Sequence, residues 1–553
     1  MRTTLRTRSL TFVTLIAVLA LALAACGGDA PATSKPAAPA SQAAPAPVVA
    51  PVNPAGPADK PAAAAEKPAA AAPAAAGPQK LTVAMGGTAD TLDPHMTTSG
   101  IGAPTIYAVY DGLTYIDDKG QLKPALATEW KVVNPTKWEF KLRSGVKFHT
   151  GEDFTAEVVK WNIDRIINPD TKSPVKSRIP VVTSVDIVDA STVQLNTSAP
   201  DPILDKRMAV IFMVAPKEFE RLGATEFGKK GSGTGSFKAI EYQKDNFVEL
   251  EAFKQSWRGA PKLDRVSLKG MPEASVRVAA LRAGEVDMVH NLPTSQAADL
   301  QRDGFGIQWA VVARAHHVGM APTRHEAFKD KRVRQALNYA VDKDAIIKNI
   351  MHGYAKKSKG QFVDELVFGF NPDLKEFPYD PAKAKQLLAE AGYANGFSVK
   401  MTGSNGFFPN DKETIEAISG YLDAVGVKVQ VQVEEVSVWI PKFFAGQHEA
   451  TWFQGLNWFP VMDSDFPLTW YYSQNRANVW NSPQFDALYK STQTELDKGK
   501  REAAFREIFK QLNDDPPSIY LFQPPDLFAV SKKVQGFVPR ADLVIWFDTI
   551  YKS

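Results

Sequence analysis

Side chains that could perform covalent or metal chemistry are few in this chain. It has one cysteine, Cys26, and eight histidines among 553 residues. The sequence contains no Gly-x-Ser-x-Gly turn, which would present a serine nucleophile, and no His-Glu-x-x-His pair, which would hold zinc. His316 and His317 are adjacent, so on a strand they would point to opposite faces of the sheet. The sequence therefore predicts no catalytic residue, no metal site and no cofactor.

The surroundings of Cys26 give this cysteine a different chemistry. Arg2, Arg6 and Arg8 precede an apolar run from about residue 10 to residue 25, and the run ends in Leu-Ala-Ala-Cys at 23–26. A positive flank, a short apolar segment and small residues before a processing point are typical of an export signal. The run is also shorter than the roughly 20 apolar residues that a membrane-spanning helix needs.

The tetrapeptide that ends in Cys26 resembles the lipobox of bacterial lipoproteins. The resemblance implies that residues 1–25 are a signal peptide, that cleavage occurs before Cys26, and that a lipid is attached to its sulfur. The mature chain would then be tethered at the cell membrane outside the cytoplasm, in the periplasm or on the outer face of the cytoplasmic membrane. The alternatives left open are a signal anchor and a buried structural cysteine.

Charge and composition narrow the partners of the mature chain. The formal net charge is +3, and the three arginines of the signal account for the whole excess. A nearly neutral mature chain does not favour nucleic acid, which attracts strongly basic surfaces. Residues 26–79 are rich in Ala and Pro and almost free of large apolar side chains, so they cannot bury enough surface to fold. We expect a disordered linker there.

Beyond this linker the sequence predicts alternating helices and strands. Period-2 alternation predicts strands, and longer periodic segments predict helices. The N-cap and first-turn pair Asp380-Pro381 is typical of a helix start. The pattern favours an α/β protein of several lobes. The expected strands are 80–85, 138–142, 192–195, 247–250, 265–268, 427–433 and 518–522, and the expected helices are 103–112, 155–167, 273–283, 331–349, 381–391, 414–424 and 500–512.

Several short motifs occur in one order along the folded part. They include Thr-Leu-Asp-Pro-His at 91–95 and Val-Arg-Gln-Ala-Leu-Asn-Tyr-Ala-Val-Asp at 333–342. Together they resemble the extracellular solute-binding proteins of ABC transporters, family 5, the peptide/nickel-binding class. The resemblance runs from about residue 80 to about residue 551. The remaining motifs are 109–115, 123–130, 138–142, 145–151, 154–159, 233–238 and 281–287.

This resemblance implies a two-lobed periplasmic-binding-protein fold of type II, with an extra domain inserted in the first lobe. The expected crossings between the lobes lie near Ala310 and Leu521. The first lobe would comprise 80–120, 214–310 and 521–553, the inserted domain 121–213, and the second lobe 311–520.

The resemblance also implies where a ligand would bind. In the first lobe, the loop with Thr98, Ser99 and Gly100 matches a ligand-contacting loop of the family. In the second lobe, Trp458 matches a tryptophan that peptide-binding members follow, three residues later, with an aspartate that pairs with the ligand's α-amino group. This chain has Val461 there, which weakens that pairing unless Asp463 or Asp465 substitutes. Ring stacking and polar orientation predict further pocket residues in this lobe: Asn405, Phe407, Trp439, Asn457 and Trp470.

The function implied is that of a lipid-anchored solute-binding protein, not an enzyme. It would capture a peptide or another small organic solute as a monomer and deliver it to the permease subunits of an ABC importer in the membrane. Two alternatives stay open. A nickel or metal chelate is the ligand of another branch of the same family. The second alternative is an exported hydrolase, although no sequence pattern indicates the two neighbouring carboxylates that a glycosidase would use.

Overall fold

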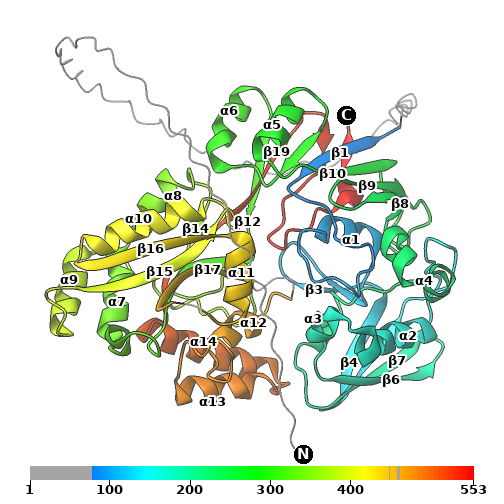
Figure 1. Ribbon diagram of the computed structural model, residues 1–553. Helices are drawn as coiled ribbons and strands as arrows, with labels where there is room; N and C mark the ends of the chain where they lie inside the picture. The colour runs from blue at the N-terminus through cyan, green and yellow to red at the C-terminus, as the bar shows by residue number, and fades with distance from the viewer. Residues whose placement is uncertain (1–77, 448, 458–460) are drawn as a thin grey trace, which may run out of the picture. The chain divides into compact units, whose positions relative to one another are not determined.

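The computed structural model describes residues 78–447, 449–457 and 461–553. Within these residues no helix combines the length and apolar character that a membrane crossing requires. Three sheets of four or more strands, with their helices, make up most of the described fold, and the two larger sheets define the two lobes (Figure 1). The predicted α/β class corresponds to two mixed sheets, each with two adjacent parallel pairs and antiparallel pairs elsewhere.

The first lobe is built on a seven-stranded sheet around β1, which starts at the predicted residue. β10 and β11 flank β1 in parallel, and the outer strands pair antiparallel. In sheet order the strands are β12 (Gly306–Val311), β19 (Pro525–Val530), β11 (Met288–His290), β1 (Lys80–Met85), β10 (Arg265–Gly270), β9 (Phe247–Ala252) and β8 (Phe237–Gln243). The lobe's helices are α1 (Ala103–Val109), α4 (Pro216–Lys230), α5 (Ala274–Arg282) and α6 (Ala297–Arg302). A short pair, β20 (Val534–Gln535) and β21 (Tyr551–Lys552), lies near the C-terminus of the chain.

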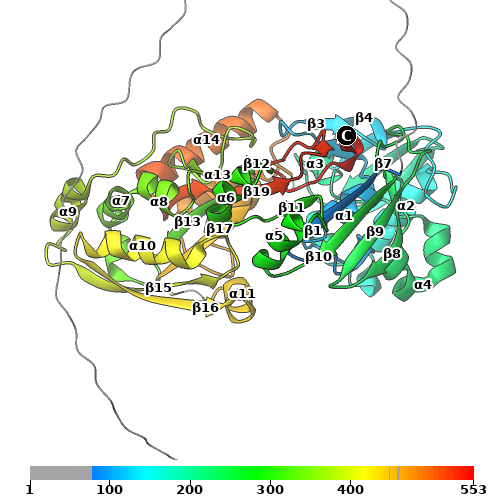
Figure 2. The same cartoon turned by 90° about the horizontal axis from the view of Figure 1, so that it is seen from above.

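The second lobe is built on a six-stranded sheet whose central strands are buried on both faces. Helix α10 packs along β15 and β16, as Figure 2 shows. In sheet order the strands are β14 (Lys356–Lys357), β18 (Ser518–Gln523), β13 (Arg314–Met320), β17 (Thr451–Asn457), β15 (Phe397–Asn405) and β16 (Val427–Glu435). The helices are α7 (Lys331–Ala340), α8 (Lys343–Asn349), α9 (Pro381–Glu390), α10 (Asp411–Asp423), α11 (Val436–Phe444), α12 (Asp465–Leu468), α13 (Pro483–Thr492) and α14 (Lys498–Asp514).

A smaller antiparallel sheet forms the inserted domain. Its strand β5 buries Trp138, Phe140 and Leu142 and turns the charged residues between them outward, the period-2 pattern that the sequence shows. The sheet order is β4 (Ala127–Asn134), β5 (Lys137–Leu142), β7 (Thr192–Thr197) and β6 (Val182–Asp189), with helices α2 (Ala156–Ile167) and α3 (Leu204–Arg207). A hairpin of β2 (Thr114–Ile116) and β3 (Leu122–Pro124) leads into it.

The chain passes between the two large sheets twice, slightly later than the sequence indicates. β12 belongs to the first sheet and β13 to the second, so the first crossing is at residues 312–313 rather than near Ala310. Leu521 is a buried residue of β18 in the second sheet, which moves the second crossing to Pro524. The Val312 N–H donates to the Pro524 carbonyl at 2.9 Å, so a backbone hydrogen bond joins the two crossing segments.

Local signals place several helix ends correctly. Asp380 accepts a hydrogen bond from the Lys383 N–H at 2.8 Å, which confirms it as the cap of α9. Thr155 stands at the N-cap of α2, but its side chain makes no capping hydrogen bond. The helix expected over 331–349 is divided into α7 and α8, and the Asp342 carboxylate caps the second piece. The sequence analysis did not predict helices α4 and α11. Each contains a residue that disfavours helix, Gly223 in α4 and Pro441 in α11, and this residue hides the helical period.

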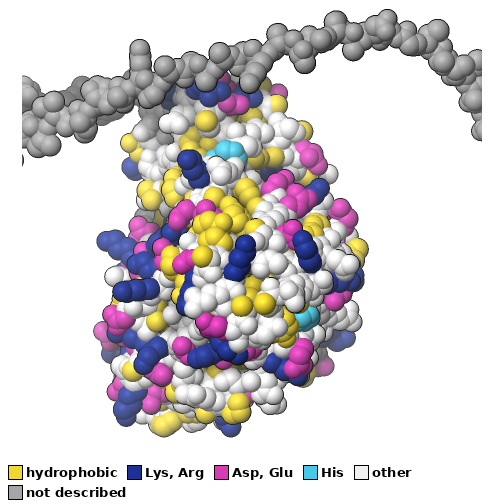
Figure 3. Space-filling view, turned by 90° about the vertical axis from the view of Figure 1, so that its left-hand side faces the viewer, with side chains coloured by type: hydrophobic (Ala, Val, Ile, Leu, Met, Phe, Trp, Pro, Cys, Tyr) yellow, Lys and Arg dark blue, Asp and Glu magenta, His cyan; other side chains and the backbone are white. Residues whose placement is uncertain are grey.

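Charge is distributed over the surface without segregation on the face that Figure 3 shows. Lys and Arg side chains lie next to Asp and Glu side chains there, with apolar side chains between them. The second lobe also has exposed pairs of opposite charge, such as Lys428–Asp423 at 2.6 Å and Lys331–Asp514 at 2.8 Å. Such a surface agrees with the near neutrality of the mature chain.

Candidate functional site

The carboxyl ends of the parallel strands in both lobes lie on the side of the two crossing segments. In the first sheet, β12 ends and β19 begins at the edge where β1, β10 and β11 have their carboxyl ends. In the second sheet, β13 begins beside the last residue of β17, which runs parallel to β15. Ligands of open α/β sheets bind outside the carboxyl ends of strands. The candidate site therefore comprises the strand ends and loops that adjoin the crossings.

Arg314 begins β13 at this edge of the second sheet. Its Nε–H donates to Oδ1 of Asn457, the last residue of β17, at 2.6 Å. Its guanidinium carbon lies 5.3 Å from the centroid of the Phe408 ring, in cation–π range. Among the residues that the structure describes, no acceptor is hydrogen-bonded to the Nη atoms of Arg314, and no carboxylate forms an ion pair with it.

Burial acts on the charge of Arg314. Desolvation lowers the pKa of its guanidinium to about 10, and the charge of Asp526 opposes that effect. Asp526 lies on β19 of the first lobe and is itself held by His290 Nε2, at 2.9 Å from Oδ1. At neutral pH the site therefore contains a positive charge that has no contacting counter-charge among the described side chains.

An aromatic cluster adjoins Arg314: Phe407, Phe408, Trp439, Phe443 and Trp470. The ring centroids of Phe407 and Phe408 lie 4.6 Å apart, and Phe407 lies 6.0 Å from Trp439. Trp439 stacks on Phe443 at 4.8 Å, and Phe443 lies 4.6 Å from Trp470. Phe407 is 45% exposed whereas Trp439 is 4% exposed. Of the predicted aromatic residues, Phe407 thus presents a ring to solvent, and Trp439 supports it from below.

The two predicted asparagines lie at neighbouring strand ends. Asn405 ends β15 and is exposed, and its amide nitrogen lies 3.3 Å from a carboxylate oxygen of Glu435. Asn457 ends β17 and is occupied in part by Arg314. The structure places both at the same edge of the second sheet, and their contact with a ligand stays a prediction. Trp458, the residue after Asn457, lies outside the described residues, as does Cys26.

The first-lobe loop with Thr98, Ser99 and Gly100 is exposed and folded by local hydrogen bonds. Thr97 donates its hydroxyl to Asp90 at 2.9 Å and accepts from the Ser99 N–H at 3.0 Å. A Cβ placed on Gly87, just after β1, would meet the Ile101 side chain at 3.1 Å, so the loop lies against the carboxyl end of β1. A Cβ on Gly100 would meet nothing within 4 Å, so close packing does not require glycine there.

Asp463 has a different environment from the one expected of a ligand-binding residue. Its carboxylate is fully buried, with Oδ1 2.7 Å from Arg501 Nη2 and Oδ2 2.8 Å from Arg501 Nη1. Lys206 of the inserted domain also reaches Oδ2, at 3.3 Å. Asp465 accepts hydrogen bonds from Tyr489 and Gln493. Since each oxygen of Asp463 is occupied by a cation of the protein, we assign it to the contact between the second lobe and the inserted domain and not to ligand recognition.

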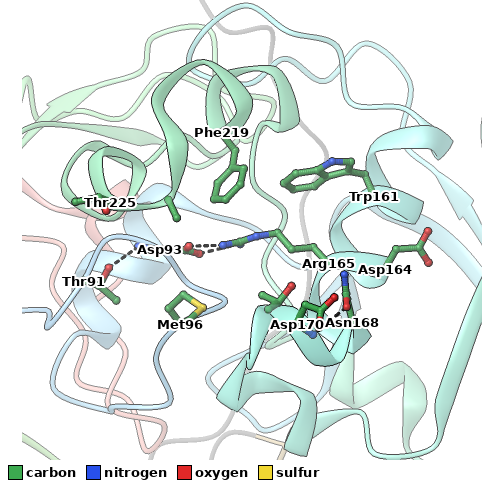
Figure 4. A pocket seen from close by; sticks show the side chains of 12 residues that line it. Thr91, Asp93, Met96, Trp161, Asp164, Arg165, Asn168, Asp170, Phe219 and Thr225 are labelled. Atoms are coloured by element: carbon green, nitrogen blue, oxygen red, sulfur yellow. Dashed lines mark hydrogen bonds and ion pairs between the residues drawn. The ribbon is translucent and has the colours of Figure 1, made fainter.

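A separate hollow lies between the first lobe and the inserted domain, with a volume of about 730 Å³ (Figure 4). Arg165 crosses its floor toward Asp93, 2.6 Å away, and its guanidinium carbon lies 4.1 Å from the Phe219 ring centroid. Arg165 also contacts the His95 ring at 2.8 Å. These partners satisfy the charge of Arg165, and the hollow contains no residue of the second sheet.

The sequence of the chain matches the model of one protein family. The model of the bacterial extracellular solute-binding proteins, family 5, matches residues 121–478, more than half of the chain. The chain belongs to this family. Its members are substrate-binding components of ABC importers that act outside the cytoplasm, and the predicted family and two-lobed type II fold are confirmed.

Three comparisons relate this family 5 protein to known ones. The glutathione-binding protein GsiB of Pectobacterium atrosepticum is 28% identical over 485 residues, which cover 84% of this chain and 93% of the relative. CtaP from Listeria monocytogenes, an ABC transporter substrate-binding protein, has a TM-score of 0.78 at 21% identity, over 86% of this chain and 99% of that one. DppA from Helicobacter pylori, solved with the peptide STSA, has a TM-score of 0.71 at 24% identity, over 86% and 98%. The two structures share the fold.

Sequence reasoning missed the charged centre of this solute-binding protein. Arg314 is the single charge within the run Val-Val-Ala-Arg-Ala at 311–315. An isolated charge next to a predicted lobe crossing was the signal that could have found it. Arg501 carried no such signal, because it sits in a helix with many other charges.

Proposed function

We propose that this family 5 solute-binding protein captures a short peptide or a similar small organic solute between its lobes. A lipid on Cys26 holds the monomeric chain at the membrane, and the permease subunits of an ABC importer receive the solute. The carrying observation is that both sheets direct the carboxyl ends of their parallel strands toward the same two crossing segments. A hinge at these crossings closes the lobes when the solute binds the closed form better.

The chemistry of the site supports a peptide-like solute. The described strand ends offer the amides of Asn405 and Asn457, the exposed Phe407 ring and the Arg314 guanidinium. Amides and a ring suit a ligand with a polar backbone and some apolar surface. Glutathione, a modified tripeptide, is the solute named for the relative GsiB, and it has this character. The loop with Thr98, Ser99 and Gly100 supplies contacts from the first lobe.

Native mass spectrometry of the whole chain, purified without denaturation, tests this proposal. We expect an added mass that corresponds to a small organic solute or a short peptide. Recovery of a nickel or other metal–chelate adduct alone would contradict the peptide-like solute and favour the metal-carrying branch. Turnover of an added candidate solute would contradict the binding function and favour an exported hydrolase.

Replacing Phe407 with alanine should weaken binding of the co-purified solute about 5- to 10-fold, because one face of the site loses its ring. Since Phe407 is 45% exposed, the free energy of unfolding should change by less than about 1 kcal/mol. Titration calorimetry and urea unfolding measure the two effects. Tyr379→Ala is the matched control, because Tyr379 is 46% exposed in the same lobe but packs on Tyr421. If Phe407→Ala and Tyr379→Ala bind the solute with equal affinity, Phe407 does not contact the solute.

A further inference from the structure

We infer that Arg314 binds a carboxylate of the transported solute. This inference rests on the proposed function and specifies the class of solute: an organic acid of peptide character with a free carboxylate. The guanidinium has a planar fork of donors, and its two terminal nitrogens match the two oxygens of one carboxylate. Asn457 takes only the Nε–H, at 2.6 Å, so the fork itself stays open.

Other buried arginines in the described part of the chain show what Arg314 lacks. Arg165 pairs with Asp93 at 2.6 Å, and Arg501 pairs with Asp463 at 2.7 Å. Arg277 instead donates both Nη groups to three backbone carbonyls, which lie on the loops after β10 and β11. Among the described residues, Arg314 has neither a carboxylate partner nor backbone carbonyls that accept from its Nη groups. A desolvated cation without a partner is costly, so an anion that completes the pair gains more free energy here than in water.

The acid that acts on the charge of Arg314 does not complete this pair. Among the described residues Asp526 influences the charge of Arg314 but forms no ion pair with it, and its carboxylate lies 2.9 Å from the imidazole of His290. Within the described part of the chain, His316, which shares the sheet face with Arg314, has no hydrogen-bond partner on either ring nitrogen. Burial and the charge of Arg314 lower the pKa of His316 well below its ordinary value, so its ring is neutral and adds no second cation.

The backbone provides a slot for the Arg314 side chain. A Cβ on Gly455 would lie 2.5 Å from Cδ and 2.9 Å from Cγ of Arg314, so only glycine leaves room for this stem. The stem crosses the strand at Gly455, and Asn457 and Phe408 then hold the guanidinium on two sides. Such preorganisation lowers the entropy that is lost when a ligand binds.

The neighbouring strand ends favour one negative charge. Asn405 and Asn457 are neutral amides, and Glu435 brings an acid to the same edge of the sheet. A solute with one carboxylate and several amide groups can pair with Arg314 and hydrogen-bond to these asparagines. A dianion such as a phosphate monoester would meet Glu435 without a second cation among these strand ends.

The test compares each solute as a free acid and as its carboxamide. The probes are glutathione and a set of di- to tetrapeptides, titrated calorimetrically into the whole mature chain. We expect at least one acid to bind wild type and its amide to bind about 30- to 100-fold more weakly, as for the loss of one partner of a desolvated charge pair. Arg314→Gln should bind both forms with equal, weak affinity.

Three further variants make the result specific. Arg314→Lys keeps the charge without the fork and should recover part of the preference for the acid. Gly455→Ala should lower that preference, because its Cβ displaces the arginine stem. Arg506→Gln, which removes an exposed arginine paired with Glu502 in the same lobe, should leave it unchanged. Circular dichroism and melting temperature must match wild type, and Arg314→Lys provides the reading should Arg314→Gln fail to fold.

The outcomes separate the two proposals. If wild type binds acids and amides equally, or if Arg314→Gln keeps the preference for the acid, Arg314 is not the carboxylate anchor, while peptide capture stands. If no probe of either form binds wild type, capture of peptide-like solutes fails, and the inference fails with it. Loss of the acid preference in Arg314→Gln, with the preference lowered in Gly455→Ala and unchanged in Arg506→Gln, supports both.

Discussion

Replacing Asp463 with alanine should lower the free energy of unfolding by about 3–5 kcal/mol, because it leaves a buried cation without its counter-charge. The Asp463 carboxylate is fully buried and receives two hydrogen bonds from Arg501, at 2.7 and 2.8 Å. The Arg501 side chain is itself only 4% exposed, so water cannot replace the lost carboxylate. Urea unfolding followed by tryptophan fluorescence measures the change.

The same variant predicts a pH dependence. Burial alone would raise the pKa of Asp463, but the charges of Arg501 and Lys206 outweigh burial and hold the pKa below its ordinary value. A carboxylate with a lowered pKa stabilises the fold above its unfolded pKa, and this stability is lost as the pH falls through the folded pKa. The difference between wild type and Asp463→Ala should therefore be full at pH 7 and shrink below about pH 4.

Asp514→Ala is the matched control for this prediction. Asp514 belongs to α14, like Arg501, but its side chain is 69% exposed and pairs with Lys331 at the surface. Its loss should change the free energy of unfolding by less than about 0.5 kcal/mol, since solvent screens such pairs. If the two variants lower the free energy of unfolding equally, the buried Asp463–Arg501 pair contributes no more to stability than an exposed pair.

Replacing Cys26 with serine should leave the chain without its lipid, so that every copy from which residues 1–25 have been removed lies in the soluble fraction. Serine has no sulfur to carry the lipid, and the linker that follows holds no apolar segment to replace it. Because Cys26 is the only cysteine, wild-type chain extracted from membranes should show no free thiol after denaturation. Fractionation with immunodetection, and thiol labelling of the purified chain, check the two statements.

A change elsewhere in the linker separates the lipid from general effects of mutation. Ser41→Ala leaves Cys26 intact and should leave the chain in the membrane fraction. Recovery of the wild-type membrane form with residues 1–25 still attached and no added lipid mass would contradict the lipid and support a signal anchor. A reactive thiol in the wild-type membrane form would do the same.

The sequence alone determined features whose causes are local. The strand at β1 begins at Lys80, where the alternation starts, and the Asp380 cap opens α9 because carboxylate and backbone donor are three residues apart. His316 and His317 face opposite sides of β13: His316 contacts the Phe408 and Phe453 rings, whereas His317 contacts the Phe362 ring and Gln454. Period and chain direction suffice for such predictions, and the ordered motifs added the family and its two lobes.

The candidate site was predictable only in part. Phe407, Asn405 and Asn457 could be named because polar and aromatic residues at loop-like positions favour a pocket. Whether a given ring faces solvent was not predictable, since Trp439 is buried where Phe407 is exposed. The lobe boundary near Leu521 was also misplaced, because apolar strands β18 and β19 follow each other with only Pro524 between them.

Only the tertiary structure decided which charges are satisfied within the protein. Asp463 finds Arg501 38 residues away and Lys206 257 residues away, whereas Arg314 finds Asn457 143 residues away and no carboxylate among the described residues. The pairing of a buried charge depends on which elements pack around it, and packing brings together residues that no local pattern relates. The sequence thus determined the family and the two-lobed frame, and it predicts the anchor signal at Cys26. Packing determined that Asp463 joins the second lobe to the inserted domain and that the Nη groups of Arg314 have no acceptor among the described residues.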